Sequence, residues 1–154
     1  MKRLVGLVAT LSFAMLALSE EVVKPTAERK GSSPLMVPYA ELKWIELHEV
    51  RGTQFAVISG DPRTGPYRQM RRVPAGTDNP LHTHSSQITN VIIQGVLYTG
   101  VNSVAAKDFG PGSVIVMPAD WVHVSGCRPG SDCVFYQEGK GKFDYHPAPA
   151  STAR

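Results

Sequence analysis

The stretch that decides the fold reads GTDNPLHTHSSQITNVIIQG and runs from Gly76 to Gly95. Two histidines, His82 and His84, are separated by one residue in a segment that we expect to be a strand. Side chains in a strand alternate between its two faces, so both imidazoles point to the same face. Two imidazoles on one face are half of a metal site. The same pattern also occurs as surface decoration, so the residues around the pair must decide between the two interpretations.

The frame around the pair resembles the first motif of the cupin family. That motif is a glycine, five residues, His-x-His, three or four residues, a glutamate, six residues and a glycine. The chain matches it at Gly76, His82, His84 and Gly95. The second cupin motif is a glycine, five residues, Pro-x-Gly, two residues, a histidine, three residues and an asparagine.

The chain matches this second motif at Gly112, Pro118 and His123. The resemblance extends over residues 39 to 147. Within the family, the chain is most similar to small secreted cupins of the RmlC-like and ChrR-like kind. It implies an all-β, single-domain protein with the cupin double-stranded β-helix, a jelly-roll barrel. It also implies that His123 joins the His-x-His pair in binding a metal ion.

The chain departs from the cupin pattern at the glutamate. Ile88 and Thr89 stand at the two positions where it would fall, and the nearest amide or acid is Gln87. If the alternation of the next strand starts at Gln87, then Val91 and Ile93 share its face and point into the barrel. We therefore predict Gln87 as the fourth ligand. Two further departures, Asp120 in place of the motif's second glycine and Cys127 in place of its asparagine, leave the local turn open to question.

The predicted metal ligands are His82, His84, Gln87 and His123. Three imidazoles and a neutral amide suit one divalent ion, namely Fe, Zn, Ni or Mn. Because many cupins with three histidine ligands are dioxygenases, we expect a metal-dependent dioxygenase that acts on a small organic molecule. The alternatives are a lyase or isomerase that uses the metal as a Lewis acid, and a non-catalytic module that binds a metal or a small ligand. The fold alone does not separate these functions.

The remaining sequence independently indicates a β protein. About nine or ten short apolar segments are separated by glycine and proline turns, and no helical period of useful length occurs, which is typical of a sandwich or barrel. The chain of 154 residues is long enough for one domain with a real core. We place the cupin domain at residues 38–148, preceded by a linker or N-terminal arm at 20–37 and followed by a flexible tail at 149–154.

Residues 1–19 have the pattern of a secretory signal peptide. Lys2 and Arg3 precede an almost wholly apolar run from Leu4 to Leu18, and small residues follow at the expected cleavage site before Glu20. The run is shorter than the roughly 20 residues that span a membrane. We therefore expect a secreted or periplasmic protein with no stable membrane anchor.

The charge of the chain limits the classes of partner that we expect. Removing the basic residues of the signal leaves 14 basic against 13 acidic residues, and no basic run with interleaved aromatics occurs, so we expect a small-molecule ligand and no nucleic acid. The cupin resemblance implies a homodimer, for which the apolar stretch Leu42–Leu47 is the candidate contact.

Cys127 and Cys133 are either bridged across a Pro-Gly turn or packed as two free thiols.

Several other residues are weaker candidates. Those that could contact a substrate or support the ligands are Tyr98, Tyr136, Arg68, Arg71 and Asn90. Trp121 is either a packing residue at the barrel mouth or a platform for substrate. His48 and His146 lie outside both motifs, and we expect them to be exposed to solvent.

Overall fold

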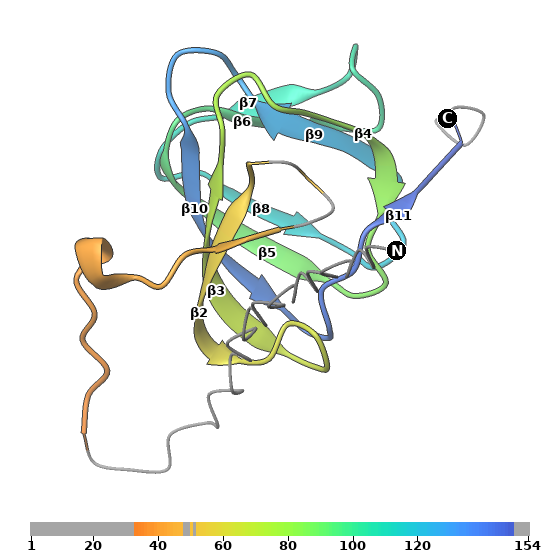
Figure 1. Cartoon of the computed structure of the whole chain (residues 1–154). Coiled ribbons are helices and arrows are strands. Elements are labelled where there is room, and N and C mark those ends of the chain that lie inside the picture. The colour runs from red at the N-terminus through yellow and green to blue at the C-terminus, as the bar shows by residue number, and fades with distance from the viewer. Residues whose placement is uncertain (1–32, 48–49, 51, 150–154) are drawn as a thin grey trace, which may run out of the picture.

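The protein consists of two antiparallel β-sheets that face each other, as a computed structural model shows (Figure 1). The structure describes residues 33–47, 50 and 52–149. The larger sheet has six strands in the order β1-β2-β3-β10-β5-β8. Their bounds are β1 Ile45–Glu46, β2 Gln54–Gly60, β3 Tyr67–Val73, β10 Cys133–Gly139, β5 Ile88–Gln94 and β8 Val114–Met117.

The smaller sheet has five strands in the order β11-β4-β9-β6-β7. Their bounds are β11 His146–Pro147, β4 Asp78–Thr83, β9 His123–Cys127, β6 Leu97–Gly100 and β7 Lys107–Phe109. Neighbours within each sheet come from distant parts of the sequence, as the order β4-β9-β6 shows. This architecture confirms the predicted all-β jelly-roll barrel. The one helix within the described residues is the single 3-10 turn η1, Tyr39–Glu41.

Strand β3 illustrates how the sequence specifies which side chains enter the barrel. Tyr67, Gln69, Arg71 and Val73 are buried, and the residues between them are more exposed. This period of two is the pattern of a strand with one face on a core. Two of the inward positions, Gln69 and Arg71, are polar, so the interior of the barrel beside β3 is not purely apolar.

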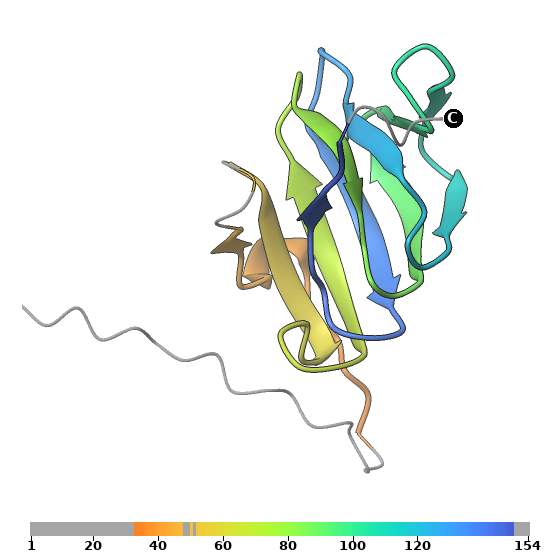
Figure 2. The same ribbon diagram turned by 90° about the vertical axis from the view of Figure 1, so that its right-hand side faces the viewer.

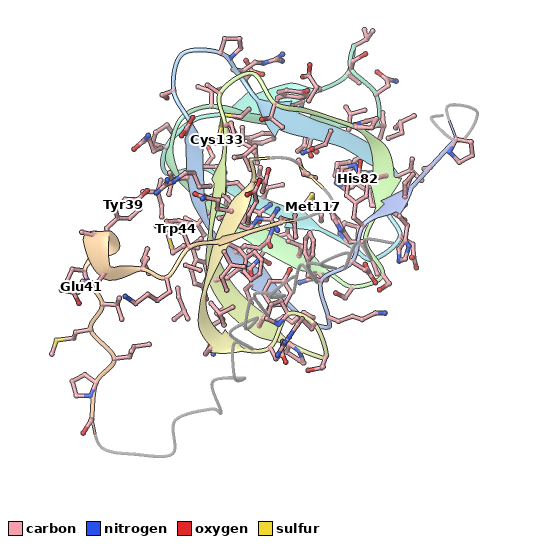
Figure 3. All side chains as sticks on the ribbon, viewed as in Figure 1. Tyr39, Glu41, Trp44, His82, Met117 and Cys133 are labelled. Carbon is pink, nitrogen blue, oxygen red and sulfur yellow. A yellow bond between two sulfur atoms is a disulfide. The ribbon has the colours of Figure 1, made fainter. Side chains whose placement is uncertain are left out.

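An apolar core fills the space between the sheets. Its buried members are Val73, Ile88, Ile92, Leu97, Ile115, Met117, Cys127, Cys133 and Phe135. Met117 lies inside the barrel between the two sheets (Figure 3). Since each contributing strand places alternate residues inward, the core is built from small contributions of many strands.

Residues 140–147, which we call the C-terminal strap, cross the barrel and end in β11 (Figure 2). β11 pairs with β4, where His146 lies opposite Thr83 and Pro147 opposite His82. At the other end of the strap, the backbone N–H of Lys140 donates to the carbonyl of Gln87 at 3.0 Å. The strap is therefore fixed at both ends, beside the strand that carries His82.

The two cysteines form a disulfide. Cys127 ends β9 and Cys133 begins β10, and their Cα atoms are 5.7 Å apart. This settles the alternative that the sequence left open, in favour of the bridge. The bond connects the two sheets at a point where both residues are almost completely buried.

Several predictions concern residues outside the described part of the chain. The signal peptide at 1–19 and His48 lie outside the described residues, as does most of the arm at 20–37. Within the described part, no helix has the length and apolar character needed to cross a bilayer. Leu47, at the end of the stretch proposed for dimer contact, is buried and lines the central cavity, so the homodimer stays a prediction.

Candidate metal centre

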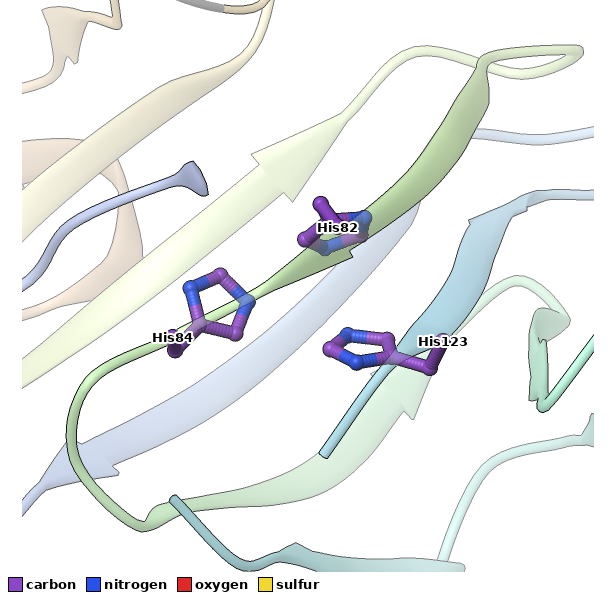
Figure 4. A group of neighbouring side chains, drawn as sticks. All are labelled: His82, His84 and His123. Atoms are coloured by element: carbon purple, nitrogen blue, oxygen red, sulfur yellow. The ribbon is translucent and has the colours of Figure 1, made fainter. Parts of the chain in front are cut away.

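Three histidines from two neighbouring strands converge inside the barrel (Figure 4). His82 lies on β4, His84 follows directly after β4, and His123 begins β9. β4 and β9 pair so that His82 is opposite His123. All three side chains are buried, and one ring nitrogen of each lies within 4.8 Å of the others, a group that could hold one metal ion.

Each imidazole is oriented by a backbone carbonyl. The acceptors for Nδ1 are the carbonyl of Pro80 for His82 at 2.7 Å, of Asp144 for His84 at 2.5 Å and of Trp121 for His123 at 2.8 Å. A carbonyl oxygen can only accept, so Nδ1 carries the proton in all three rings and Nε2 keeps its lone pair. The buried Nε2 of His123 has no hydrogen-bond partner within the described chain. A ring held through one nitrogen with the other free is the arrangement of metal-binding histidines.

Burial keeps the three rings neutral at physiological pH. It lowers the pKa of His82 to about 3 and that of His84 to about 4, and the positive charge that His123 would carry adds to both effects. The pKa of His123 is also lowered, again because burial disfavours the charged ring. Neutral imidazole is the form that binds a metal ion, so the donor set fits a divalent ion without any prior loss of protons.

Every imidazole also has an aromatic neighbour. Tyr145 stacks on His82 with ring centroids 4.3 Å apart, and Trp121 stacks on His123 at 4.9 Å. Phe143 lies 5.5 Å from His84. Two of these three aromatic residues belong to the C-terminal strap. Trp121 therefore packs against a candidate ligand, which favours the packing interpretation of this residue.

A cavity of about 60 Å³ adjoins the histidines. Its wall includes Arg71 and Asn90, two of the weaker candidates from the sequence, and both are buried. Neither Asp nor Glu occurs among the described residues that line it. A water molecule needs roughly 10–15 Å³ by this measure, so the space suits a ligand of only a few heavy atoms.

Four buried polar side chains are linked by hydrogen bonds that end at Asn90. The hydroxyl of Tyr67 and the amide nitrogen of Gln69 both donate to Oε1 of Gln137, at 3.2 and 2.8 Å. Nε2 of Gln137 then donates to Oδ1 of Asn90 at 3.0 Å. Since its oxygen already accepts, Asn90 presents its two N–H hydrogens as the groups available for a ligand.

The face assignment that led to Gln87 is wrong. On β5, Ile88 and Ile92 are 1% exposed and point inward with Asn90, while Ile93 is 50% exposed. Gln87 precedes the strand and is not among the residues that line the cavity. The irregular Ser85–Gln87 segment breaks the alternation between the His-x-His strand and β5, so the structure gives no support to Gln87 as a ligand.

The remaining candidates lie away from the histidines. The Tyr98 hydroxyl donates to Asp78, and Arg68 lies 3.7 Å from Glu138 in an exposed ion pair. Neither Tyr98, Arg68 nor Tyr136 lines the cavity. His146 is exposed, as expected, and its Nε2 lies 3.3 Å from the carboxylate of Asp144.

The turn between the second motif's proline and histidine is retained despite the missing glycine. Asp120 takes the left-handed conformation, with a φ of 58°, that a glycine adopts most easily. Its backbone N–H donates to the carbonyl of His84 at 2.9 Å. The two motifs are thus joined directly at the site.

Sequence reasoning missed the C-terminal strap as part of the site. Phe143, Asp144 and Tyr145 all contact the histidines, through a ring, a carbonyl and a ring respectively. The signal that could have found them is the aromatic-x-aromatic spacing of Phe143 and Tyr145, which is the spacing of one strand face. Its position next to the Pro- and Ala-rich tail concealed that pattern.

Comparisons with known proteins agree with this fold. A family model described as "Domain of unknown function (DUF4437)" matches residues 24–146. No curated protein sequence matches the chain. Among solved structures, an RmlC-like cupin protein from Ralstonia eutropha JMP134 is similar, with 19% identity, a TM-score of 0.59, and coverage of 73% of this chain and 72% of that chain.

Two further solved structures share the fold. The polyketide cyclase RemF from Streptomyces resistomycificus has 15% identity and a TM-score of 0.63, and the match covers 79% of this chain and 89% of that chain. KdgF from Halomonas sp. has 15% identity and a TM-score of 0.53, with 67% and 92% of the two chains covered. At these identities the likeness establishes the cupin barrel and nothing about the reaction.

Proposed function

Because this chain belongs to the DUF4437 family and has a cupin barrel, we propose that it binds one divalent metal ion and acts as a metal-dependent dioxygenase on a small organic molecule. The observation that carries the proposal is the convergence of His82, His84 and His123, each with Nδ1 bound to a carbonyl. Three protein ligands leave coordination positions open for a substrate.

The residues around the centre hold the ligands and exclude water. Trp121, Phe143 and Tyr145 cover the three imidazoles, so the rings keep one orientation in an apolar surrounding. Tyr145 lines the cavity, and burial raises its pKa further above neutral, so its protonated hydroxyl can donate a hydrogen bond to a ligand. A bound redox-active ion such as Fe(II) would supply the activation of oxygen.

The lining of the cavity favours oxygen chemistry over proton abstraction. A lyase or isomerase needs a general base within reach of the substrate, and such a base works best with a pKa near the operating pH. No carboxylate lines the cavity among the described residues, and the three histidines are committed to the centre.

Lewis-acid chemistry is the second candidate function, and one observation favours it. All three ligands are neutral imidazoles, so they cancel none of the charge of a divalent ion. Such an ion polarises a bound oxygen atom strongly. The fold itself supports either reaction, since one architecture hosts many chemistries.

The experiment that tests the proposal is elemental analysis of the metal content of the protein without its signal segment, purified with neither a histidine tag nor a chelator. About one equivalent of iron, followed by substrate-dependent oxygen uptake, supports the dioxygenase. Zinc, nickel or manganese with no oxygen uptake supports the Lewis-acid alternative. Failure to bind any of these ions, even after reconstitution, rejects both and leaves a ligand-binding barrel.

Export from the cytoplasm is part of the proposal. The disulfide between Cys127 and Cys133 supports it, because such bonds persist in oxidising compartments and are rare in the reducing cytosol. Mass spectrometry of the protein isolated from its native host tests this. A mature chain that begins at Glu20 supports export, and a chain that retains Met1 argues against it.

A further inference from the structure

The central cavity has the positive charge of Arg71 on one wall and the three candidate metal ligands on the other. Arg71 comes from β3 and Asn90 from β5, both in the six-stranded sheet. His82 and His123 come from β4 and β9 in the five-stranded sheet. All four line the same cavity. A ligand in this space therefore lies between the guanidinium and the histidines.

Arg71 is positioned as part of the cavity and not as a surface residue. It is 6% exposed, and its guanidinium carbon lies 4.8 Å from the centroid of the Phe143 ring. Phe143 is also the aromatic neighbour of His84, at 5.5 Å. Both groups are thus neighbours of the same ring, and the charge of Arg71 contributes to lowering the pKa of His84.

The described residues that line the cavity include the positively charged Arg71 and no carboxylate. A divalent ion at the three neutral imidazoles would add two positive charges to that of Arg71, and no Asp or Glu of the described residues lines the space. The nearest carboxylate, that of Asp144, does not line the cavity. It accepts from the backbone N–H of Ser85 at 2.8 Å, pairs with His146, and partly offsets the effect of Arg71 on the pKa of His84. Positive charge in a desolvated space is stabilised when an anion enters it.

Asn90 adds donors to this arrangement. The chain of hydrogen bonds through Gln137 fixes its amide oxygen as an acceptor, so the N–H hydrogens are what it offers to a ligand. A guanidinium fork and an amide N–H group together match the planar oxygens of a carboxylate.

We infer that the cavity binds a small carboxylate, with one carboxylate oxygen at the metal centre and the other against Arg71 and Asn90. The inference rests on the proposed function, because it places one end of the ligand at the metal ion. The cavity of about 60 Å³ has room for a short carboxylate. A neutral molecule of the same shape lacks the charge that the wall of the cavity selects.

The experiment uses protein loaded with Co(II), whose visible absorption changes when a ligand enters the coordination sphere. The cobalt content is measured first, then the protein is titrated with acetate and, separately, with its uncharged match acetamide. We expect acetate to bind and acetamide not to bind at the same concentrations. In the Arg71→Gln variant the affinity for acetate falls about 10- to 100-fold, the loss typical of a charge-assisted contact.

Two further variants make the result specific. Arg72→Gln removes the same charge from the next residue of β3, where Arg72 faces outward over the ring of Trp44, and acetate affinity stays at the wild-type value. Arg71→Lys keeps the charge and loses the fork, so it gives an intermediate affinity. This variant also keeps the test valid if Arg71→Gln does not fold.

The outcomes separate the two proposals. Wild-type protein that binds no cobalt overturns the proposed metal centre, and the carboxylate site with it. Wild-type protein that binds cobalt but binds acetate no better than acetamide overturns the carboxylate site alone. Equal acetate affinity in the wild type and in a folded, cobalt-loaded Arg71 variant does the same.

Discussion

The backbone carbonyl of Asp144 accepts a hydrogen bond from Nδ1 of His84, although the two residues are 60 positions apart in the sequence. The carboxylate of the same residue accepts from the backbone N–H and the hydroxyl of Ser85. One residue of the strap therefore fixes both the proton position of a candidate ligand and the turn that follows it. Loss of such a supporting contact typically lowers metal affinity about 10- to 100-fold.

The Asp144→Ala variant should weaken metal binding. It removes both hydrogen bonds to Ser85, so the strap loses the contacts that hold its carbonyl against His84. We expect the dissociation constant for Zn(II) to rise by about 10-fold or more, within the range known for such supporting residues. Competition with a chelating dye measures it.

Asp144→Asn is the matched variant for this test. Its amide oxygen can still accept from the backbone N–H of Ser85, so metal affinity should lie between those of the wild type and the alanine variant. Equal affinity in all three proteins would show that the strap does not support the centre.

Replacing any one of His82, His84 and His123 with alanine should abolish stoichiometric metal binding. The barrel should stay folded, because its core consists of apolar residues contributed by both sheets. The measurement is metal content after dialysis, with circular dichroism as the check on folding. Arg68→Ala is the control, since that side chain is exposed, does not line the cavity and should leave the metal content unchanged. Full occupancy in both the His82 and His123 variants would refute the assignment.

The stability of the metal-free protein should fall as the pH decreases below about 6.5. In the unfolded chain a histidine gains its proton near pH 6.5, whereas burial lowers the pKa of His82 to about 3 and that of His84 to about 4 in the folded chain. Between these values only the unfolded state binds the proton. The free energy of unfolding therefore decreases by up to about 1.4 kcal/mol per pH unit for each such ring.

Urea unfolding of the metal-free protein at pH 7, 6 and 5 measures this effect. The interval from pH 6.5 to 5 isolates the histidines, because carboxylates titrate mainly below it. A protein with both His82 and His84 replaced by alanine should show a flatter dependence on pH. The same slope in that variant and in the wild type would assign the effect to other groups.

Reducing the disulfide should destabilise the barrel without affecting the metal centre. The bond between Cys127 and Cys133 closes a short loop, so its entropic contribution to the free energy of unfolding is about 2 kcal/mol. Thermal unfolding with and without a reductant measures the loss, and metal content after reduction should be unchanged. Release of the metal on reduction would mean that the bond also supports the histidines.

Local patterns predicted an all-β sandwich or barrel and the His-x-His pair, and the cupin resemblance predicted the jelly-roll barrel and the joining of His123 to that pair. The spacing of His82 and His84 defines a strand face wherever the strand lies, and the glycine and proline turns separate the strands. His123 was a candidate because it follows its own turn, and in the structure its strand pairs with β4. That pairing itself is a property of the whole fold and could be anticipated only from the family resemblance.

The face assignment behind Gln87 shows where such reasoning fails. Alternation applies within one continuous strand, and the chain leaves strand geometry between His84 and Ile88. The phase of β5 was therefore independent of the phase of the His-x-His pair. Asn90, on the true inward face, was named only as a weaker candidate. The strap was missed for a related reason, since its contacts with the histidines are made across the fold by residues about 60 positions away.

The pairing of β11 with β4 has a consequence for when the candidate centre could take up a metal ion. Translation delivers the histidines of both motifs before it delivers residues 143–147, so a nascent chain carries the ligands without Tyr145 or the Asp144 carbonyl. The centre reaches its final form only after the last part of the domain has left the ribosome. If the chain is exported unfolded, it takes up its ion from the supply of its destination and not from that of the cytoplasm.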